Sequence, residues 1–303
     1  MKTHSLTLTT PSDFHFWRTV YSHGWCSLPP FRVDKELASL HRLLELSDGT
    51  LVHCVITAPA LEKLKISVQS GKPCSSRQQQ EIRKQIRSCF RLDEDYAEFF
   101  QYVKHYPYYR WIAKLHTGRL LRSPMVFEDI VKMICTTNCS WALTEIMVNN
   151  FVESLGKKFN GGMHSFPTPE AIASTSDAFL RKEIHAGYRA PFLLEFSENV
   201  ASHKIDIEAF RSENLSTDEL YKQLRAIKGV GEYAASNLLR LLGHYDRLGL
   251  DSWTRGKYYE LHHGGRKVSD TTIEKHYASY GKWRGLIFWS EMTKHWIKQK
   301  FPF

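Results

Sequence analysis

The chain has 303 residues, of which 42% are hydrophobic and 13% aromatic, enough to bury one large core or the cores of two or three smaller domains. A total of 41 lysines and arginines against 32 aspartates and glutamates leaves a net charge of +9, which suits a nucleic-acid partner and equally an ordinary basic protein. No apolar stretch is long enough to span a membrane, and the first residues lack the apolar centre of a signal peptide, so we expect an intracellular chain.

The six cysteines form no metal-binding pattern. None belongs to a C-x-x-C pair and none follows position 139, which argues against a zinc ribbon and against a four-cysteine iron–sulfur loop near the C-terminus. Cys135 and Cys139 stand four residues apart without a histidine at ligand spacing. We expect them to be buried, reduced thiols.

The N-terminal segment predicts an antiparallel sheet. Short apolar or alternating runs, separated by Pro, Gly and Ser, are typical of strands. These runs cover residues 5–10, 27–34, 40–46, 51–58 and 61–70. Residues 47–50 (SDGT) have the Asp-Gly pair of a hairpin turn. Residues 71–80 are polar and predict a connection, and from Glu81 onward the pattern is helical.

The rest of the chain predicts helices. Residues 122–156 carry two helical patterns that are interrupted near residues 136–140. Residues 166–174 lead from a loop into a helix, and residues 187–202 open with a glycine and continue helically. A strand-rich segment followed by an all-helical body predicts an α+β fold in which helix dominates.

We expect three domains. A small antiparallel β domain occupies residues 1–95, a helical domain occupies 96–205, and a second helical domain occupies 206–303. In the last domain, Ser216 and Glu219 form a capping-box pattern, and residues 224–243 (LRAIKGVGEYAASNLLRLLG) predict two helices joined by a tight turn.

Two glycines in this turn suggest an anion site. Gly229 and Gly231 allow positive φ and expose backbone amides, while Val230 can tuck between the helices. Exposed amides at the positive end of the second helix, with Lys228 beside them, can bind a DNA phosphate without reading the base sequence. A glycine pair also fits an ordinary turn between helices, so both interpretations stay open.

Asp251 follows Gly231 by 20 residues, the length of one helix and a short loop. We expect Asp251 at the N-terminus of the next helix, facing the glycine turn. Aspartate is also a common N-cap, so this position alone fits a purely structural role.

Together these motifs resemble the helix-hairpin-helix superfamily of base-excision DNA glycosylases. The run L-x-x-IKGVGEYAA, followed by GLD, is similar to the hairpin, Gly/Pro-rich loop and aspartate of that superfamily. Residues 123–156 resemble the two helices and Asn-bearing turn that enter the minor groove, which places Asn138 at that Asn. FPTPEAIA, GYRAPF and YGKWRGLIFWSEM resemble later segments of 8-oxoguanine and alkyl-base glycosylases, and GWCSLPPFRV is compatible with their small β domain.

The resemblance implies that a damaged base is flipped out of double-stranded DNA before its N-glycosidic bond is cut. Asp251 would stabilise the positive charge that builds on the sugar and would orient or deprotonate the attacking water. Asn138 would plug the gap in the duplex or pair with the orphaned base. Trp253, Trp283 and Trp289 would form flat walls of a base pocket, although core packing fits each of them equally.

Three positions depart from the pattern of the 8-oxoguanine enzymes. Tyr233 stands where bifunctional members carry the lysine that attacks the sugar, so the resemblance implies a monofunctional enzyme that uses water. Tyr233 would instead stack on the base, as in alkyl-base glycosylases. Trp253 replaces a histidine, and Gly285 replaces a glutamine that contacts the base edge. An aromatic pocket favours cationic alkylated purines, so we expect 3-methyladenine-type lesions first and 8-oxoguanine second.

The remaining expectations concern contacts and partners. Lys228, Arg255 and Lys257 are candidate contacts to the DNA backbone. We expect a monomer that binds duplex DNA containing a damaged base, without an iron–sulfur cluster, and with at most a monovalent cation held by hairpin carbonyls. Three alternatives stay open: a non-catalytic DNA-binding protein, a bifunctional glycosylase and lyase, and a helical module without lesion preference.

Overall fold

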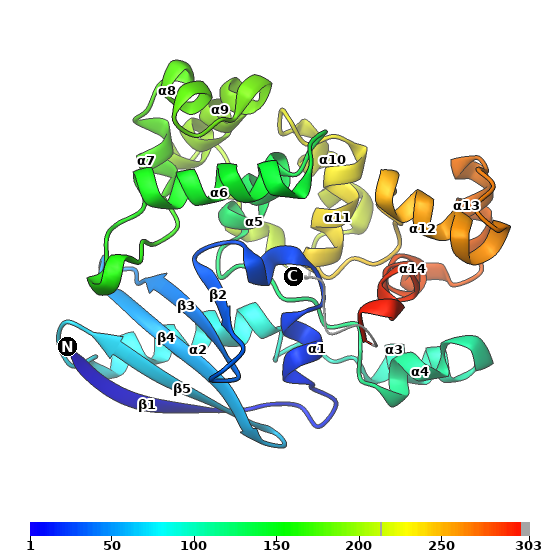
Figure 1. Ribbon diagram of the computed structural model, residues 1–303, viewed down its shortest axis with the longest axis horizontal. Coiled ribbons are helices and arrows are strands. Elements are labelled where there is room, and N and C mark those ends of the chain that lie inside the picture. Colours follow the sequence, from blue (N-terminus) through cyan, green and yellow to red (C-terminus); the bar gives the residue numbers. More distant parts are fainter. Residues whose placement is uncertain (213, 298–303) are drawn as a thin grey trace. The chain divides into compact units, whose positions relative to one another are not determined.

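The computed structural model describes residues 1–212 and 214–297 and divides into two compact units. The first unit contains residues 1–94 and 119–208, and the second contains residues 95–118 together with the described chain from 209 onward. The sheet lies in the N-terminal part of the chain, and nearly all later elements are helices (Figure 1). The predicted α+β fold dominated by helix is confirmed.

The first unit holds a five-stranded antiparallel sheet in the order β1-β5-β4-β3-β2. Its strands are β1 (Lys2–Thr9), β2 (Phe31–Asp34), β3 (Ser39–Glu45), β4 (Leu51–Ala60) and β5 (Lys63–Ser70). The register places Leu6, Ile66 and Ile56 side by side across three strands, and all three are buried, so the period-two pattern builds one apolar face. The predicted strands and the turn at residues 47–50 are confirmed, except that the second strand begins at Phe31 and not at Ser27.

The first unit also contains seven α-helices (Figure 1). They are α1 (Phe16–Val20), α2 (Ser76–Phe90), α5 (Val126–Cys135), α6 (Trp141–Leu155), α7 (Pro169–Ala173), α8 (Asp177–Lys182) and α9 (Ala190–Ala201). The break expected near residues 136–140 separates α5 from α6. The start of α2 was predicted too late, at Glu81. The Ser75 hydroxyl accepts a hydrogen bond from the backbone amide of Gln78, and Oε1 of Gln78 accepts one from the backbone amide of Ser75. This capping box begins the helix within the polar run.

A buried ion cluster joins the sheet to α5. Arg42 on β3 donates to both carboxylate oxygens of Glu128, at 2.8 and 2.5 Å, and Lys132 donates to Glu128 at 2.7 Å. These three residues are at most 2% exposed. Phe31 covers the cluster, with its ring centroid 4.5 Å from the Arg42 guanidinium carbon. One carboxylate therefore holds two cations inside the protein.

The second unit is helical and has an aromatic core. Its helices are α3 (Ala97–Lys104), α4 (Arg110–Lys114), α10 (Thr217–Ala226), α11 (Glu232–Leu242), α12 (Ser252–His263), α13 (Asp270–Ala278) and α14 (Arg284–Thr293). Phe99, Tyr258, Tyr277 and Phe288 are buried together in this core. Residues 95–118 pack with the C-terminal helices. The division into three domains at 95 and 205 stays a prediction from the sequence.

None of the six cysteines forms a disulfide bond. Burial raises the pKa of Cys135 to about 12, as expected for an inert buried thiol. The expectation is only partly correct for Cys139, which is partly exposed because it lies in the turn between α5 and α6; its thiol donates to the Cys135 carbonyl at 3.1 Å. None of the helices described is long and apolar enough to cross a bilayer. Within residues 1–212 and 214–297, no three His, Cys, Asp or Glu side chains gather as metal ligands.

Candidate functional site

The turn between α10 and α11 contains one left-handed glycine. Gly229 has φ +86°, whereas Gly231 has φ −75° and ψ −178°. The expected positive φ is therefore correct at Gly229 and wrong at Gly231, which serves as the N-cap of α11 in extended backbone. Val230 is buried as predicted, and its amide donates to the Ile227 carbonyl at 3.0 Å, which closes the turn.

The N-terminus of α11 has no side-chain cap, because Gly231 carries no side chain. The first amides of a helix have no partner within the helix, and the helix dipole gives that end partial positive charge. Lys228 and Gly231 are exposed, and Gly229 is half-buried. The hairpin therefore presents amide donors next to a cation at the surface, which suits a phosphate oxygen.

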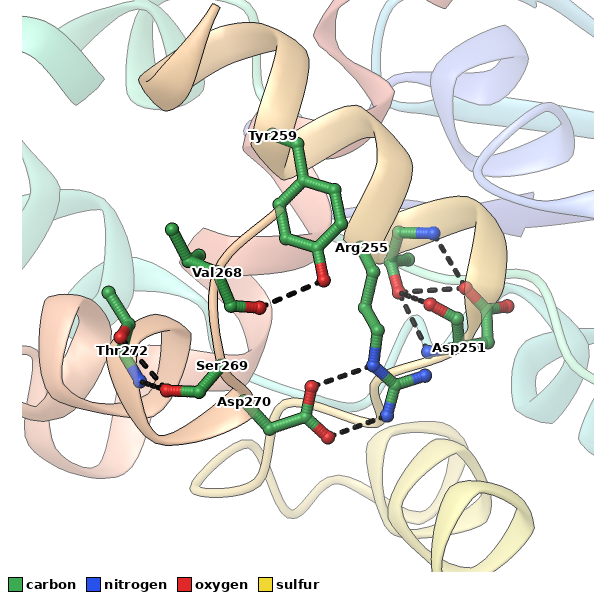
Figure 2. Close-up of polar contacts among 8 residues, drawn as sticks. Asp251, Arg255, Tyr259, Val268, Ser269, Asp270 and Thr272 are labelled. Carbon is green, nitrogen blue, oxygen red and sulfur yellow. Dashed lines mark hydrogen bonds and ion pairs between the residues drawn. The ribbon is translucent and has the colours of Figure 1, made fainter. Parts of the chain in front are cut away.

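Asp251 is the N-cap of α12 and is half-buried. Its Oδ1 accepts hydrogen bonds from the Thr254 amide at 2.6 Å and the Thr254 hydroxyl at 2.7 Å, and the Asp251 amide donates to that hydroxyl at 2.9 Å (Figure 2). The second carboxylate oxygen accepts no hydrogen bond from the residues that the structure describes. The cap thus fixes the carboxylate group through one of its two oxygens.

Two of the three predicted tryptophans come together. Trp253, in the first turn of α12, is 41% exposed, and its ring centroid lies 6.0 Å from that of Trp289 on α14. The ring centroid of Trp296, which was not predicted as a site residue, lies 5.5 Å from that of Trp253. Trp283 instead stacks on Tyr245 at 5.6 Å, within the aromatic core. This partly buried position at the edge of the core fits the core-packing alternative for Trp283.

Tyr233 occupies the first turn of α11 and is half-buried. Arg240, further along the same helix, is buried. Burial lowers the pKa of Arg240 to about 10, and the negative charge of Asp251 opposes that lowering. The Arg240 guanidinium carbon also lies 4.9 Å from the centre of the Trp289 ring. Arg240 of α11 thus contacts the Trp289 ring of α14 and is affected by the charge of Asp251, the N-cap of α12.

Two predicted DNA contacts are engaged in ion pairs. Arg255 donates to both carboxylate oxygens of Asp270, each at 2.7 Å (Figure 2). The Lys257 Nζ atom lies 3.0 Å from Oε2 of Glu260. These carboxylates partly compensate the positive charges that a phosphate would meet. Lys228, by contrast, directly precedes Gly229 in the hairpin turn itself.

Gly285 has a packing role that the sequence comparison did not foresee. It begins the buried side of α14, and its amide donates to the Tyr245 carbonyl at 2.6 Å. A side chain at this position would collide with the backbone carbonyl of Arg247. Position 285 therefore faces the protein interior, and its glycine carries no information about the damaged base.

Asn138 lies in the first unit, in the turn between α5 and α6. It is exposed and adopts φ +46°. Its amide nitrogen donates to the Tyr188 hydroxyl at 3.2 Å, and that hydroxyl donates to the Thr137 carbonyl at 3.3 Å. The Arg189 guanidinium carbon lies 4.6 Å from the centre of the Tyr188 ring. Tyr188 and Arg189 were not predicted, although they stand in the quoted GYRAPF segment.

The sequence and the fold were compared with those of known proteins. No family model matches the chain. A protein of Methanothermobacter thermautotrophicus named a probable N-glycosylase/DNA lyase is 23% identical over 293 residues, which cover 89% of each chain. The structure of a 3-methyladenine DNA glycosylase from Archaeoglobus fulgidus superposes with a TM-score of 0.76, at 19% identity, over 96% of this chain and 99% of that one.

The chain resembles the helix-hairpin-helix DNA glycosylases in sequence and in fold. The 8-oxoguanine glycosylase/lyase of Clostridium acetobutylicum in its apo-form shares this glycosylase fold, with a TM-score of 0.72 and 19% identity over 96% of this chain and 95% of that one. The same Clostridium enzyme has been solved with double-stranded DNA, and that complex superposes with a TM-score of 0.64, at 17% identity, over 90% of this chain and 99% of that one. The resemblance first inferred from short motifs thus extends over nearly the whole glycosylase fold.

Proposed function

We propose that this chain is an intracellular, monomeric DNA glycosylase that removes a damaged purine from double-stranded DNA. The observation that carries the proposal is the placement of Asp251, whose capping box fixes one carboxylate oxygen and leaves the other available. The similarity over 89% of the chain to a probable N-glycosylase/DNA lyase supports the same reaction class. Release of free base from alkylated duplex DNA, measured by chromatography, tests the proposal.

The reaction follows from the chemistry of the N-glycosidic bond. The base leaves with the bonding electrons, so the sugar gains positive charge in the transition state. A carboxylate close to the sugar stabilises that charge, and it also accepts a hydrogen bond from the attacking water. Asp251 supplies the carboxylate. Asn138, on the exposed α5–α6 turn, fills the space that the flipped nucleotide leaves.

The DNA backbone binds at the hairpin. The uncapped amides of α11, with Lys228 beside them, hold a phosphate and bring Asp251 to the nucleotide. Because phosphate contacts do not depend on the base, this hairpin binds DNA of any sequence.

Substitution of Gly229 tests this role of the hairpin. A β-branched side chain at φ +86° costs about 1–2 kcal/mol of backbone strain, so Gly229→Val should distort the turn and weaken binding to an abasic-analogue duplex about tenfold. Fluorescence anisotropy measures this affinity. Gly231→Ala is the matched control, because its backbone is extended and the nearest atom lies 3.7 Å from the added carbon. Equal affinity of Gly229→Val and wild type would remove the hairpin from the DNA interface.

The substrate we propose is an alkylated purine such as 3-methyladenine, with 8-oxoguanine second. Trp253 and Trp289 supply aromatic faces next to each other, and a cationic alkylated base is attracted to such faces. Tyr233 adds a third aromatic side chain at the start of α11. Because Gly285 is a packing residue, the preference depends on these three rings.

We propose further that cleavage uses water and leaves the strand intact. Tyr233 cannot form a Schiff base with the sugar, so the chain lacks a nucleophilic amine at that position. The names of the Methanothermobacter and Clostridium relatives favour the second candidate, a bifunctional glycosylase and lyase.

Borohydride trapping separates these two candidates. Wild type should give no covalent adduct with lesion-containing duplex, whereas Tyr233→Lys should give a weak one, since it places an amine in the first turn of α11. Tyr233→Phe, which introduces no amine, is the control. Efficient trapping of wild type would establish the lyase and end the water-only mechanism.

The reaction as proposed needs no cofactor. A monovalent cation at the hairpin would require the carbonyls of the turn, but the Val230 carbonyl accepts a hydrogen bond from Arg225 at 3.2 Å. The Arg225 guanidinium therefore already brings positive charge to that oxygen, and a cation would have to displace it. We assign no step to a cation.

A further inference from the structure

Arg240 is a buried cation in the middle of the candidate site. It lies on the inward face of α11 and is only 3% exposed. Taking a guanidinium out of water is costly unless the protein replaces its hydration, so the surrounding groups must be arranged for it. The site residues discussed above leave the role of this side chain unexplained.

Arg240 connects α11 to the segment that precedes Asp251. One terminal nitrogen donates to the backbone carbonyl of Leu248. The other terminal nitrogen donates to Oδ1 of Asn237 at 3.0 Å. Asn237, one turn earlier on α11, donates to the Tyr233 carbonyl at 2.9 Å and lies 3.5 Å from the Gly249 carbonyl. Two side chains of α11 thus contact two successive carbonyls of the loop.

Gly249 makes this close approach feasible. It has φ +69°, and a side chain there would begin 2.8 Å from the Asn237 amide nitrogen and 3.1 Å from the Arg240 terminal nitrogen. A larger residue would be strained at this positive φ and would push the Asn237 amide and, slightly, the Arg240 guanidinium away from the loop. The loop backbone therefore lies directly on α11, only two residues before Asp251.

We propose that Arg240 is a positioning residue for the glycosylase reaction: its guanidinium anchors the Leu248–Gly249 segment to the hairpin helix and so fixes where Asp251 begins α12. This inference rests on the proposed function, because it takes Asp251 as the reacting carboxylate. The same guanidinium packs against Trp289, with 4.9 Å between the guanidinium carbon and the ring centre. Arg240 therefore contacts both the loop before Asp251 and one of the tryptophans proposed to bind the base. A displacement of about 1 Å between reacting groups costs roughly 100-fold in rate, which makes such anchoring consequential.

Three variants test the anchor. Arg240→Met matches the volume but removes both hydrogen bonds, and Arg240→Lys keeps a cation that can make one of them. Arg247→Met is the matched control: Arg247 is in the same loop, but its partners are Asp218 at 2.9 Å and the Tyr221 ring, both away from the anchor. Each variant is compared with wild type in two measurements.

The first measurement is amide hydrogen exchange in peptides covering residues 244–255, and it does not depend on activity. We expect exchange about tenfold faster in Arg240→Met, an intermediate effect in Arg240→Lys and no change in Arg247→Met. Unchanged protection of this segment in both Arg240 variants would overturn the inference, whatever the enzyme does. If Arg240→Met does not fold, Arg240→Lys carries the same test.

The second measurement separates rate from affinity on an alkylated duplex under single-turnover conditions. The expected loss is about 100-fold in excision rate for Arg240→Met, with partial rescue in Arg240→Lys and affinity for an abasic-analogue duplex within about twofold of wild type. Faster exchange without a loss of rate would overturn the positioning role. Wild type that releases no base, together with faster exchange in Arg240→Met, would instead end the proposed function and leave the loop anchor established.

Discussion

Asp251→Asn should lose excision activity by about 100- to 1,000-fold while the protein stays fully folded. Asparagine is as good an N-cap as aspartate, so its amide oxygen can still accept the hydrogen bond from the Thr254 amide. What disappears is the negative charge on the oxygen that is left available. The substitution therefore separates the structural role of this residue as an N-cap from the chemical role that we propose for it.

Two controls make the loss of activity interpretable. Thermal unfolding of Asp251→Asn should stay close to wild type, with only the small loss of its attraction to Arg240, whereas Asp251→Ala should lose about 1 kcal/mol more, because the cap is gone. Affinity for an abasic-analogue duplex should persist in Asp251→Asn, since the hairpin is untouched. Retained excision by this variant would favour the non-catalytic alternatives, or a different catalytic group.

Glu128→Ala should cost about 3–5 kcal/mol of unfolding free energy, a large part of a typical domain's stability. Glu128 is the carboxylate that holds both Arg42 and Lys132, and removing it leaves two cations in the interior. Urea denaturation measures the loss. Glu153→Ala, on the exposed face of α6, is the matched control and should change stability by less than about 0.5 kcal/mol.

The same cluster predicts a pH dependence. Burial alone would raise the pKa of Glu128, but Arg42 and then Lys132 lower it from 4.5 to about 2. A lowered carboxylate pKa contributes stability above the ordinary value, and this contribution is lost as the pH falls from about 4.5 towards 2. Wild type should lose stability over that range, and Glu128→Ala should lose less. Parallel curves for the two proteins would contradict the assignment.

The features that the sequence predicted correctly are local ones. The alternating runs of the sheet, the Asp-Gly turn and the cap of α12 at Asp251 each depend on a few neighbouring residues. The left-handed Gly229 belongs to the same group, because only the turn itself requires that conformation. The motifs that carried the resemblance are of this kind, which explains why short segments led to the correct fold.

The features that were missed depend on partners far away in the sequence. Arg255 forms an ion pair with Asp270 that no spacing rule indicates. The alignment suggests Trp283 and Gly285 as site residues. In the structure, Trp283 packs against the aromatic core of the second unit, and Gly285 leaves room for the Arg247 carbonyl. The cluster around Glu128 depends on Arg42, which is 86 residues away. Local periodicity carries no information about such contacts.

One measurement tests the central claim most directly: incubation of wild type and Asp251→Asn with a methylated duplex, followed by strand analysis with and without alkali. A monofunctional glycosylase that uses Asp251 predicts free methylated purine and strand breaks only after alkali with wild type, and neither with Asp251→Asn. Equal base release by the two proteins, or no release by wild type from any alkylated or oxidised purine, would contradict the account.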